Sequence, residues 1–125
     1  MHTRHHLSAP LLLVFALFLV AVNGLFEYYH LYFFLWWLDI PMHFLSGMFV
    51  ALCALAVVYR RATPLSPRRE SIFVFAVALG SALVVGALWE IFASALGHDA
   101  PNLGGLAADT IKDVANDLLG GLIAG

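Results

Sequence analysis

Charged residues are scarce in this chain. Asp, Glu, Lys and Arg make up 11% of its 125 residues, and hydrophobic residues make up 62%. A soluble domain is about 25% charged, and a domain this small cannot bury so much apolar side chain in one core. The composition therefore excludes a soluble monomer and a disordered tail. The low content of Lys and Arg also excludes a nucleic-acid binder with a basic face.

Cysteine is almost absent as well. Cys53 is the single cysteine, so the chain has no internal disulfide and is not a disulfide-stapled secreted domain. The sequence has no internal repeat, low-complexity tract or long linker. We therefore interpret residues 1–125 as one domain.

The sequence contains long apolar runs without charged residues. A membrane-spanning helix needs about 20 mostly apolar residues. Three runs meet this requirement and predict helices at about residues 7–26, 40–59 and 70–96, with His43 the one interruption of the second run. The first run is longer than the core of a signal peptide and is not followed by a clean cleavage site, so we expect it to be a retained helix.

A fourth helix is expected at about residues 107–125, although it carries Asp109, Lys112, Asp113 and Asp117. Alone it could not enter lipid, but packed within a bundle it could. The predicted fold class is therefore all-α, a polytopic membrane protein with about four transmembrane helices. The aromatic segment 28–38 lies between the first two predicted helices. Tyr and Trp collect at the membrane interface, so this segment is expected there. It predicts a short interfacial helix or a bent extension of the first helix.

The arginines indicate an orientation. Arg60, Arg61, Arg68 and Arg69 flank the loop between the second and third helices, and Arg4 precedes the first. The positive-inside rule places these residues on the cytoplasmic side of the inner membrane. Both termini are then cytoplasmic, and the acidic residues of the helices gather at the outer side.

Three predicted helices carry polar faces at that outer side. Asp39 and His43 are four residues apart and share a face of the second helix. Glu90 continues a stripe of small and polar residues on the third helix, and the acids of the fourth helix share one face. The candidate metal-ligating residues are Asp39, His43, Glu90, Asp109, Asp113 and Asp117.

Carboxylates cannot crowd together in a low dielectric unless they protonate, pair or bind a cation. Lys112 is the one cationic side chain on that side, and helical spacing places it at the edge of the polar face. A divalent metal or shared protons would balance the charge. Carboxylates with one imidazole suit Zn, Mn or Fe, whereas carboxylates alone suit Mg or Ca.

A structural role is the alternative for two of these acids. Asp39 and Asp109 can each cap the start of a helix. His43, Glu90 and Asp113 lie within predicted spans, where an ionisable residue indicates a functional site by default. We take His43 and Glu90 as the candidate catalytic residues.

The order of these motifs resembles the YjdF-like inner-membrane proteins of unknown function and, more distantly, the VanZ-like family. The resemblance covers roughly residues 39–125. The matching residues are Asp39, His43, Phe44, Gly47, Trp89, Glu90, Asp109, Asp113, Asp117 and Gly120. The resemblance implies a membrane protein associated with envelope lipids or surface polymers.

Three functions stay open on the sequence. The first is a divalent-cation site that acts on an envelope lipid or lipid-linked substrate. The second is a non-enzymatic membrane scaffold or accessory subunit, in which the acids pair and lock the bundle. The third is a proton- or metal-linked transport unit, which would need a homo-oligomer because four helices form a thin conduit. Membrane lipids are the expected partners in each case.

Overall fold

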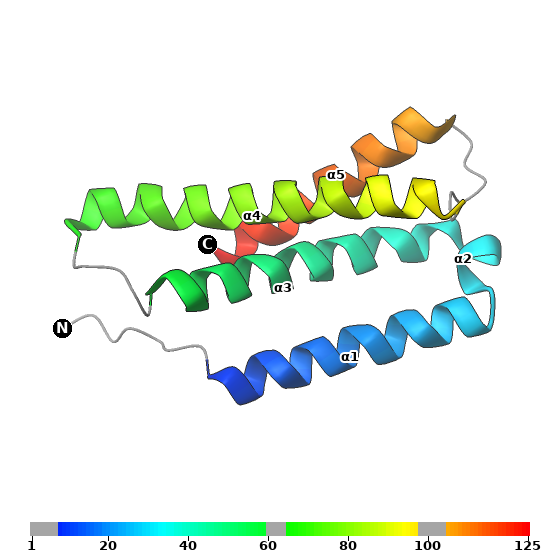
Figure 1. The fold of residues 1–125 in the computed structure, drawn as a ribbon, viewed down its shortest axis with the longest axis horizontal. Coiled ribbons are helices and arrows are strands. Elements are labelled where there is room, and N and C mark those ends of the chain that lie inside the picture. Colours follow the sequence, from blue (N-terminus) through cyan, green and yellow to red (C-terminus); the bar gives the residue numbers. More distant parts are fainter. Residues whose placement is uncertain (1–7, 60–64, 98–104) are drawn as a thin grey trace.

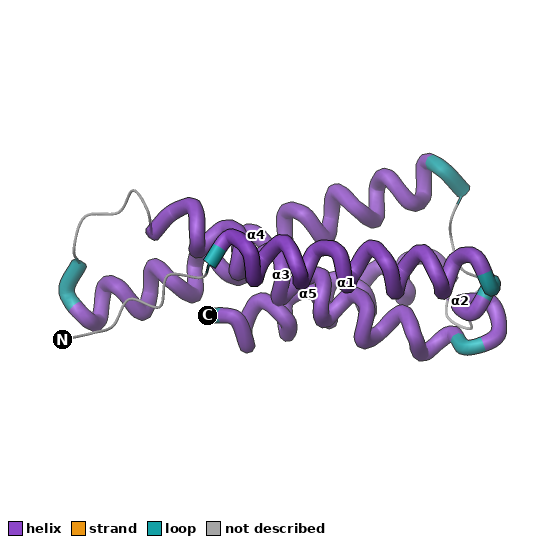
Figure 2. The backbone as a smooth tube through the Cα atoms, turned by 90° about the horizontal axis from the view of Figure 1, so that it is seen from below, coloured by secondary structure: helices purple, strands orange, loops and turns teal. Residues whose placement is uncertain are grey.

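The structure is a computed structural model that describes residues 8–59, 65–97 and 105–125. These residues form helices and no strand, which confirms the all-α class. Figure 2 shows helix over nearly all of the described chain, joined by short loops. The elements are α1 (Ala9–Tyr28), α2 (Leu31–Phe34), the 3-10 helix η1 (Trp36–Leu38), α3 (Asp39–Tyr59), α4 (Pro67–Ala95) and α5 (Gly105–Ala124).

Helix α3 lies at the centre of the bundle. It packs against α1, α4 and α5, and α5 also packs against α4. In Figure 1, α1 and α4 run along opposite sides of α3, while α5 crosses the pair α3 and α4 obliquely. The elements that carry the predicted polar faces, α3, α4 and α5, are thus the three that pack on one another.

The helix ends follow from proline and from one left-handed residue. Pro10 and Pro67 lie in the first turns of α1 and α4, where a missing N–H costs no hydrogen bond. His30 has φ 54° and separates α1 from α2. The aromatic segment is therefore not an extension of α1. It forms the short turns α2 and η1 before α3 begins.

Three helical segments among the described residues are long and apolar enough to cross a membrane, by length and composition. They are Ala9–Tyr28, Trp36–Tyr59 and Pro67–Ala95. Helix α5 is not among them, because Asp109, Lys112, Asp113 and Asp117 lower its hydropathy. Its acids Asp113 and Asp117 are buried against the other helices rather than facing outward.

Small residues let α5 approach its neighbours closely. A Cβ added at Gly120 would meet the carbonyl oxygen of Phe44 on α3, and one at Gly47 would meet the backbone of Asp117. A Cβ at Gly121 would lie 3.0 Å from the Cβ of Ala82 on α4. Glycine and alanine contacts of this kind are typical of helices that pack within membranes. They fix the depth at which the polar residues of α5 meet those of α3 and α4.

Candidate functional site

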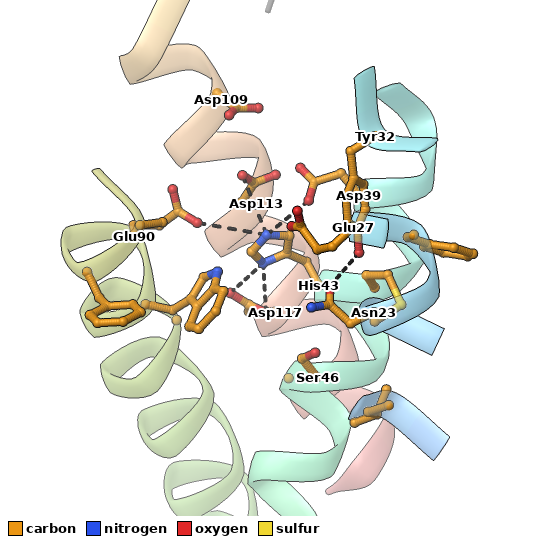
Figure 3. Close-up of a pocket in the computed structure, with 18 of the residues that line it drawn as sticks. Asn23, Glu27, Tyr32, Asp39, His43, Ser46, Glu90, Asp109, Asp113 and Asp117 are labelled. Atoms are coloured by element: carbon orange, nitrogen blue, oxygen red, sulfur yellow. Dashed lines mark hydrogen bonds and ion pairs between the residues drawn. The ribbon is translucent and has the colours of Figure 1, made fainter. Parts of the chain in front are cut away.

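His43 is the centre of a cluster of acidic side chains near the start of α3 (Figure 3). Its Nδ1 lies 3.3 Å from both carboxylate oxygens of Asp117. Its Nε2 lies 3.4 Å from Asp39 Oδ1, 3.6 Å from Asp113 Oδ2 and 3.8 Å from Glu90 Oε1. The His43 side chain is only 10% exposed. One buried imidazole therefore faces four carboxylates from α3, α4 and α5.

Asp117 lies beneath the imidazole, where the three helices meet. Gly47 on α3 adjoins its backbone, and Gly86 on α4 leaves the room that its carboxylate occupies. The Asp117 side chain is 5% exposed. Because no side chain fills positions 47 and 86, a charged group can pack at this crossing and reach His43.

Asp113 is buried one helical turn away, with its side chain 4% exposed. Its Oδ1 is buried and accepts no hydrogen bond within the described part of the chain. The ammonium Nζ of Lys112 lies 3.2 Å from this oxygen at ion-pair distance. The ion pair offsets part of the cost of burying this oxygen, which can still accept a hydrogen bond or bind a cation.

Lys112 is more central than helical spacing predicts. Its Nζ lies 2.7 Å from Asp109 Oδ1, 3.1 Å from Asp39 Oδ2 and 3.2 Å from Asp113 Oδ1. The long flexible stem of the lysine carries the charge from the edge of the α5 face to its middle. Lys112 is thus an internal counter-ion of the cluster.

Five of the six predicted residues meet directly. Asp39, Glu90, Asp113 and Asp117 all surround His43, whereas Asp109 joins the cluster through Lys112. Glu90 is also tied to α5, because Thr110 Oγ1 donates to its Oε2 at 3.4 Å.

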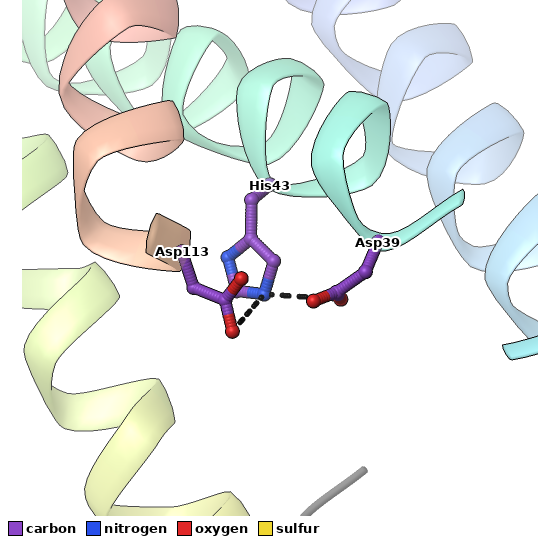
Figure 4. A group of neighbouring side chains, drawn as sticks. All are labelled: Asp39, His43 and Asp113. Atoms are coloured by element: carbon purple, nitrogen blue, oxygen red, sulfur yellow. Dashed lines mark ion pairs between the residues drawn. The ribbon is translucent and has the colours of Figure 1, made fainter. Parts of the chain in front are cut away.

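Three of these side chains offer a group of possible metal ligands, shown in Figure 4. One ligand atom each from Asp39, His43 and Asp113 lies within 4.8 Å of the others. The separations from His43 Nε2 exceed those of a strong charge-assisted hydrogen bond, which is about 2.7–2.9 Å long. Two ligands of a tetrahedral ion at 2.0–2.2 Å are roughly 3.3–3.6 Å apart. The observed 3.4 and 3.6 Å have that spacing.

A cleft of about 1130 Å³ opens beside the cluster. Residues of α1, α2, α3, α4 and α5 line it. Asn23 and Glu27 of α1 and Tyr32 of α2 are among them, and the sequence did not predict these three at the site. Tyr32 donates to Asn23 Oδ1 at 2.6 Å. Burial, helped by the charges of Asp39 and Glu27, raises the pKa of the Tyr32 hydroxyl, so it stays protonated and remains a donor. The signal for Tyr32 was the concentration of aromatic residues between α1 and α3, whereas Asn23 and Glu27 are polar residues in the last turns of α1.

The comparison with protein families covers nearly the whole chain. Residues 2–125 match the family described as Predicted membrane protein (DUF2238). The chain belongs to this family. The description agrees with the three long apolar helices, and it establishes a membrane protein rather than a particular activity. No curated protein and no solved structure matches the chain significantly. The YjdF-like and VanZ-like resemblance stays a prediction.

Proposed function

We propose that this membrane protein binds a divalent cation between Asp39, His43 and Asp113, with Glu90 beside them. The observation that carries the proposal is the spacing of His43 Nε2 from one carboxylate oxygen each of Asp39 and Asp113, where 3.4 and 3.6 Å match ligands of one ion better than hydrogen-bond partners. The buried Oδ1 of Asp113 supports it, because this oxygen accepts no hydrogen bond within the described residues and has Lys112 Nζ 3.2 Å away at ion-pair distance. One imidazole among carboxylates favours Zn, Mn or Fe.

The proposed place of this centre is the outer leaflet of the inner membrane. Arg68 and Glu90 lie on the same helix, 22 residues apart, which is about 33 Å at 1.5 Å per residue. This is close to the thickness of the hydrocarbon core, so the arginine end and the acidic end of α4 reach opposite surfaces. The positive-inside rule then places Arg68 and both termini in the cytoplasm. Arg4, Arg60 and Arg61, which carry the same prediction, lie outside the described residues, as does Asp99.

The chemistry that we propose is hydrolysis or group transfer on an envelope lipid or lipid-linked substrate. A cation held by three side chains keeps positions for water and substrate, and it lowers the pKa of bound water. Glu90 lies 3.8 Å from His43 Nε2 and lines the open cleft, so it is the group best placed to carry a proton to or from a substrate. The YjdF-like and VanZ-like resemblance supports the envelope substrate class.

Metal binding tests the proposal directly. Asp39→Asn should weaken Zn²⁺ or Mn²⁺ binding by roughly 10- to 100-fold, because it removes a charged ligand while keeping the shape of the side chain. The measurement is metal content and calorimetric titration of the protein purified in a neutral detergent. Glu70→Gln, at the other end of α4, is the matched control and should bind as the wild type does. Absence of divalent-metal binding by the wild type at neutral pH would refute the proposal.

A scaffold is the second candidate function, and Lys112 is the observation that favours it. Its ammonium already neutralises part of Asp39, Asp109 and Asp113, so the cluster could lock α3 to α5 without any ion. In that case the buried network contributes to the packing of the bundle and nothing else.

Lys112→Met separates the two functions. The variant keeps the apolar stem and removes the charge that competes for Asp39 and Asp113. With a metal centre, we expect metal affinity to rise by about tenfold and added metal to restore thermal stability. With a scaffold, the variant should melt at a lower temperature, and no divalent ion should restore it. Thermal unfolding with and without metal gives the answer.

A further inference from the structure

The cleft beside the cluster has α1 and α4 among its walls. It is lined by both of these helices and by α3 between them, and it spans about 1130 Å³. In Figure 3, Glu27 and Tyr32 lie on one side of His43 and Glu90 lies on the other. In a bilayer this cleft would be reached from the lipid between α1 and α4.

The two ends of the cleft differ in polarity. Glu27, Asp39 and Glu90 line one end, whereas Leu19, Val50 and Val85 line the other. On α1, Leu19 lies eight residues from Glu27, which is roughly 12 Å, and on α4, Val85 lies five residues from Glu90, which is roughly 7.5 Å. The cleft therefore combines an acidic end with an apolar groove that extends toward the middle of the membrane.

We propose that this cleft binds an amphiphile with a primary-amine head group and a hydrocarbon chain, which enters sideways from the bilayer. The charge of the acidic end selects a cation, because Glu27 adds a further acid to the five carboxylates that already share His43 and Lys112. Asp113 lines the same cleft, and its buried Oδ1 accepts no hydrogen bond within the described residues, with Lys112 Nζ at ion-pair distance, 3.2 Å away. Trp36 and Trp89 also line the cleft, and aromatic rings favour cations over anions.

This inference goes beyond the proposed metal centre and does not need it. A metal ion and an amine would compete for Asp113, but Glu27 belongs to the amine end alone. A second copy of the chain is a poor occupant, because a two-fold contact at this face would bring its acidic end against an identical one. A lipid with an anionic head would meet the same repulsion.

Native mass spectrometry of the full chain in a neutral detergent, with metal removed by a chelator, tests the proposal. The probes are dodecylammonium and dodecyl phosphate, which share a chain and differ in the sign of the head. We expect one dodecylammonium per protein, preferred over dodecyl phosphate by about tenfold or more. Glu27→Gln should weaken the amine by roughly three- to tenfold, whereas Glu70→Gln should not change it.

A second pair of variants tests the groove. Val85 lines the cleft and Val84 faces outward beside it, so Val85→Trp should block dodecylammonium and Val84→Trp should not. Glu27 is exposed, which keeps Glu27→Gln informative if Val85→Trp does not fold. Equal or tighter binding of dodecyl phosphate would overturn the proposal, as would a dimer that excludes both probes. Because metal is absent from this experiment, a failure to bind dodecylammonium does not contradict the proposed metal centre. Likewise, a failure of the metal titration does not contradict the binding of an amine amphiphile.

Discussion

Gly120→Ala is expected to remove most of the folded protein, although it adds a single methyl group. The new Cβ would contact the carbonyl oxygen of Phe44 and would lie 2.7 Å from the backbone nitrogen of Met48. Backbone atoms of a packed helix cannot rotate away as a side chain can, so α5 would have to leave α3. Overpacking in a core costs about 1–3 kcal/mol, and a backbone clash should cost about 3 kcal/mol or more.

The measurement is the yield of monodisperse protein in detergent together with its thermal unfolding. Gly80→Ala and Gly24→Ala are the controls, because nothing lies within 4 Å of a Cβ at either position of α4 and α1. Alanine is the better helix former by about 1 kcal/mol, so both controls should be as stable as the wild type or slightly more stable. If Gly120→Ala unfolded at the same temperature as Gly80→Ala, the close approach of α3 and α5 at Gly120 would be contradicted.

The all-helical fold was predictable because long apolar runs in a chain this size are compatible with few structures other than membrane-spanning helices. Runs that lack charge have the length of a membrane span, and the three long apolar helices of the structure correspond to them. The start of α4 could not be placed from charge alone. Arg68 and Arg69 mark the end of the apolar run, but Pro67 fits the first turn and the helix begins there.

The candidate site was predictable in part. Helical spacing places Asp113 and Asp117 on one face of α5, and both are buried in the bundle. Spacing within one helix does not give the depth at which two helices cross. Asp109 shares the face of Asp113 but lies one turn, about 6 Å, further along the axis, and it meets Lys112 instead of His43.

Spacing within one helix also does not show which side chains of other helices a residue can contact. Asp39 and Lys112 are far apart in the sequence, and their 3.1 Å ion pair depends on how α3 and α5 cross. Likewise, Tyr32 can donate to Asn23 because the left-handed His30 changes the direction of the chain after α1. Periodicity within a helix therefore identifies the acids, whereas packing between helices identifies their partners.

His43→Leu should destabilise the metal-free protein by about 3–5 kcal/mol, the usual cost of removing one partner from a buried charged group. Leucine has a similar bulk, so the loss comes from charge and hydrogen bonding rather than from a cavity. Asp117 would lose the ring nitrogen 3.3 Å from both of its oxygens. Asp39 and Asp113 would face each other across the vacated Nε2 position, with Lys112 as their remaining nearby cation.

A second substitution shows whether charge is the cause. In His43→Leu with Asp117→Asn, the carboxylate beside the missing imidazole becomes neutral while its shape is kept. Part of the lost stability should return, because a buried amide costs less than a buried unpaired charge. Thermal unfolding of the single and double variants in a neutral detergent, with metal chelated, measures the recovery. A single variant as stable as the wild type would mean that the imidazole does not hold these carboxylates together, and a double variant no better than the single would assign the loss to packing. Recovery would show that α3, α4 and α5 meet around a charge that the protein must balance, which is the condition that any bound cation would have to satisfy.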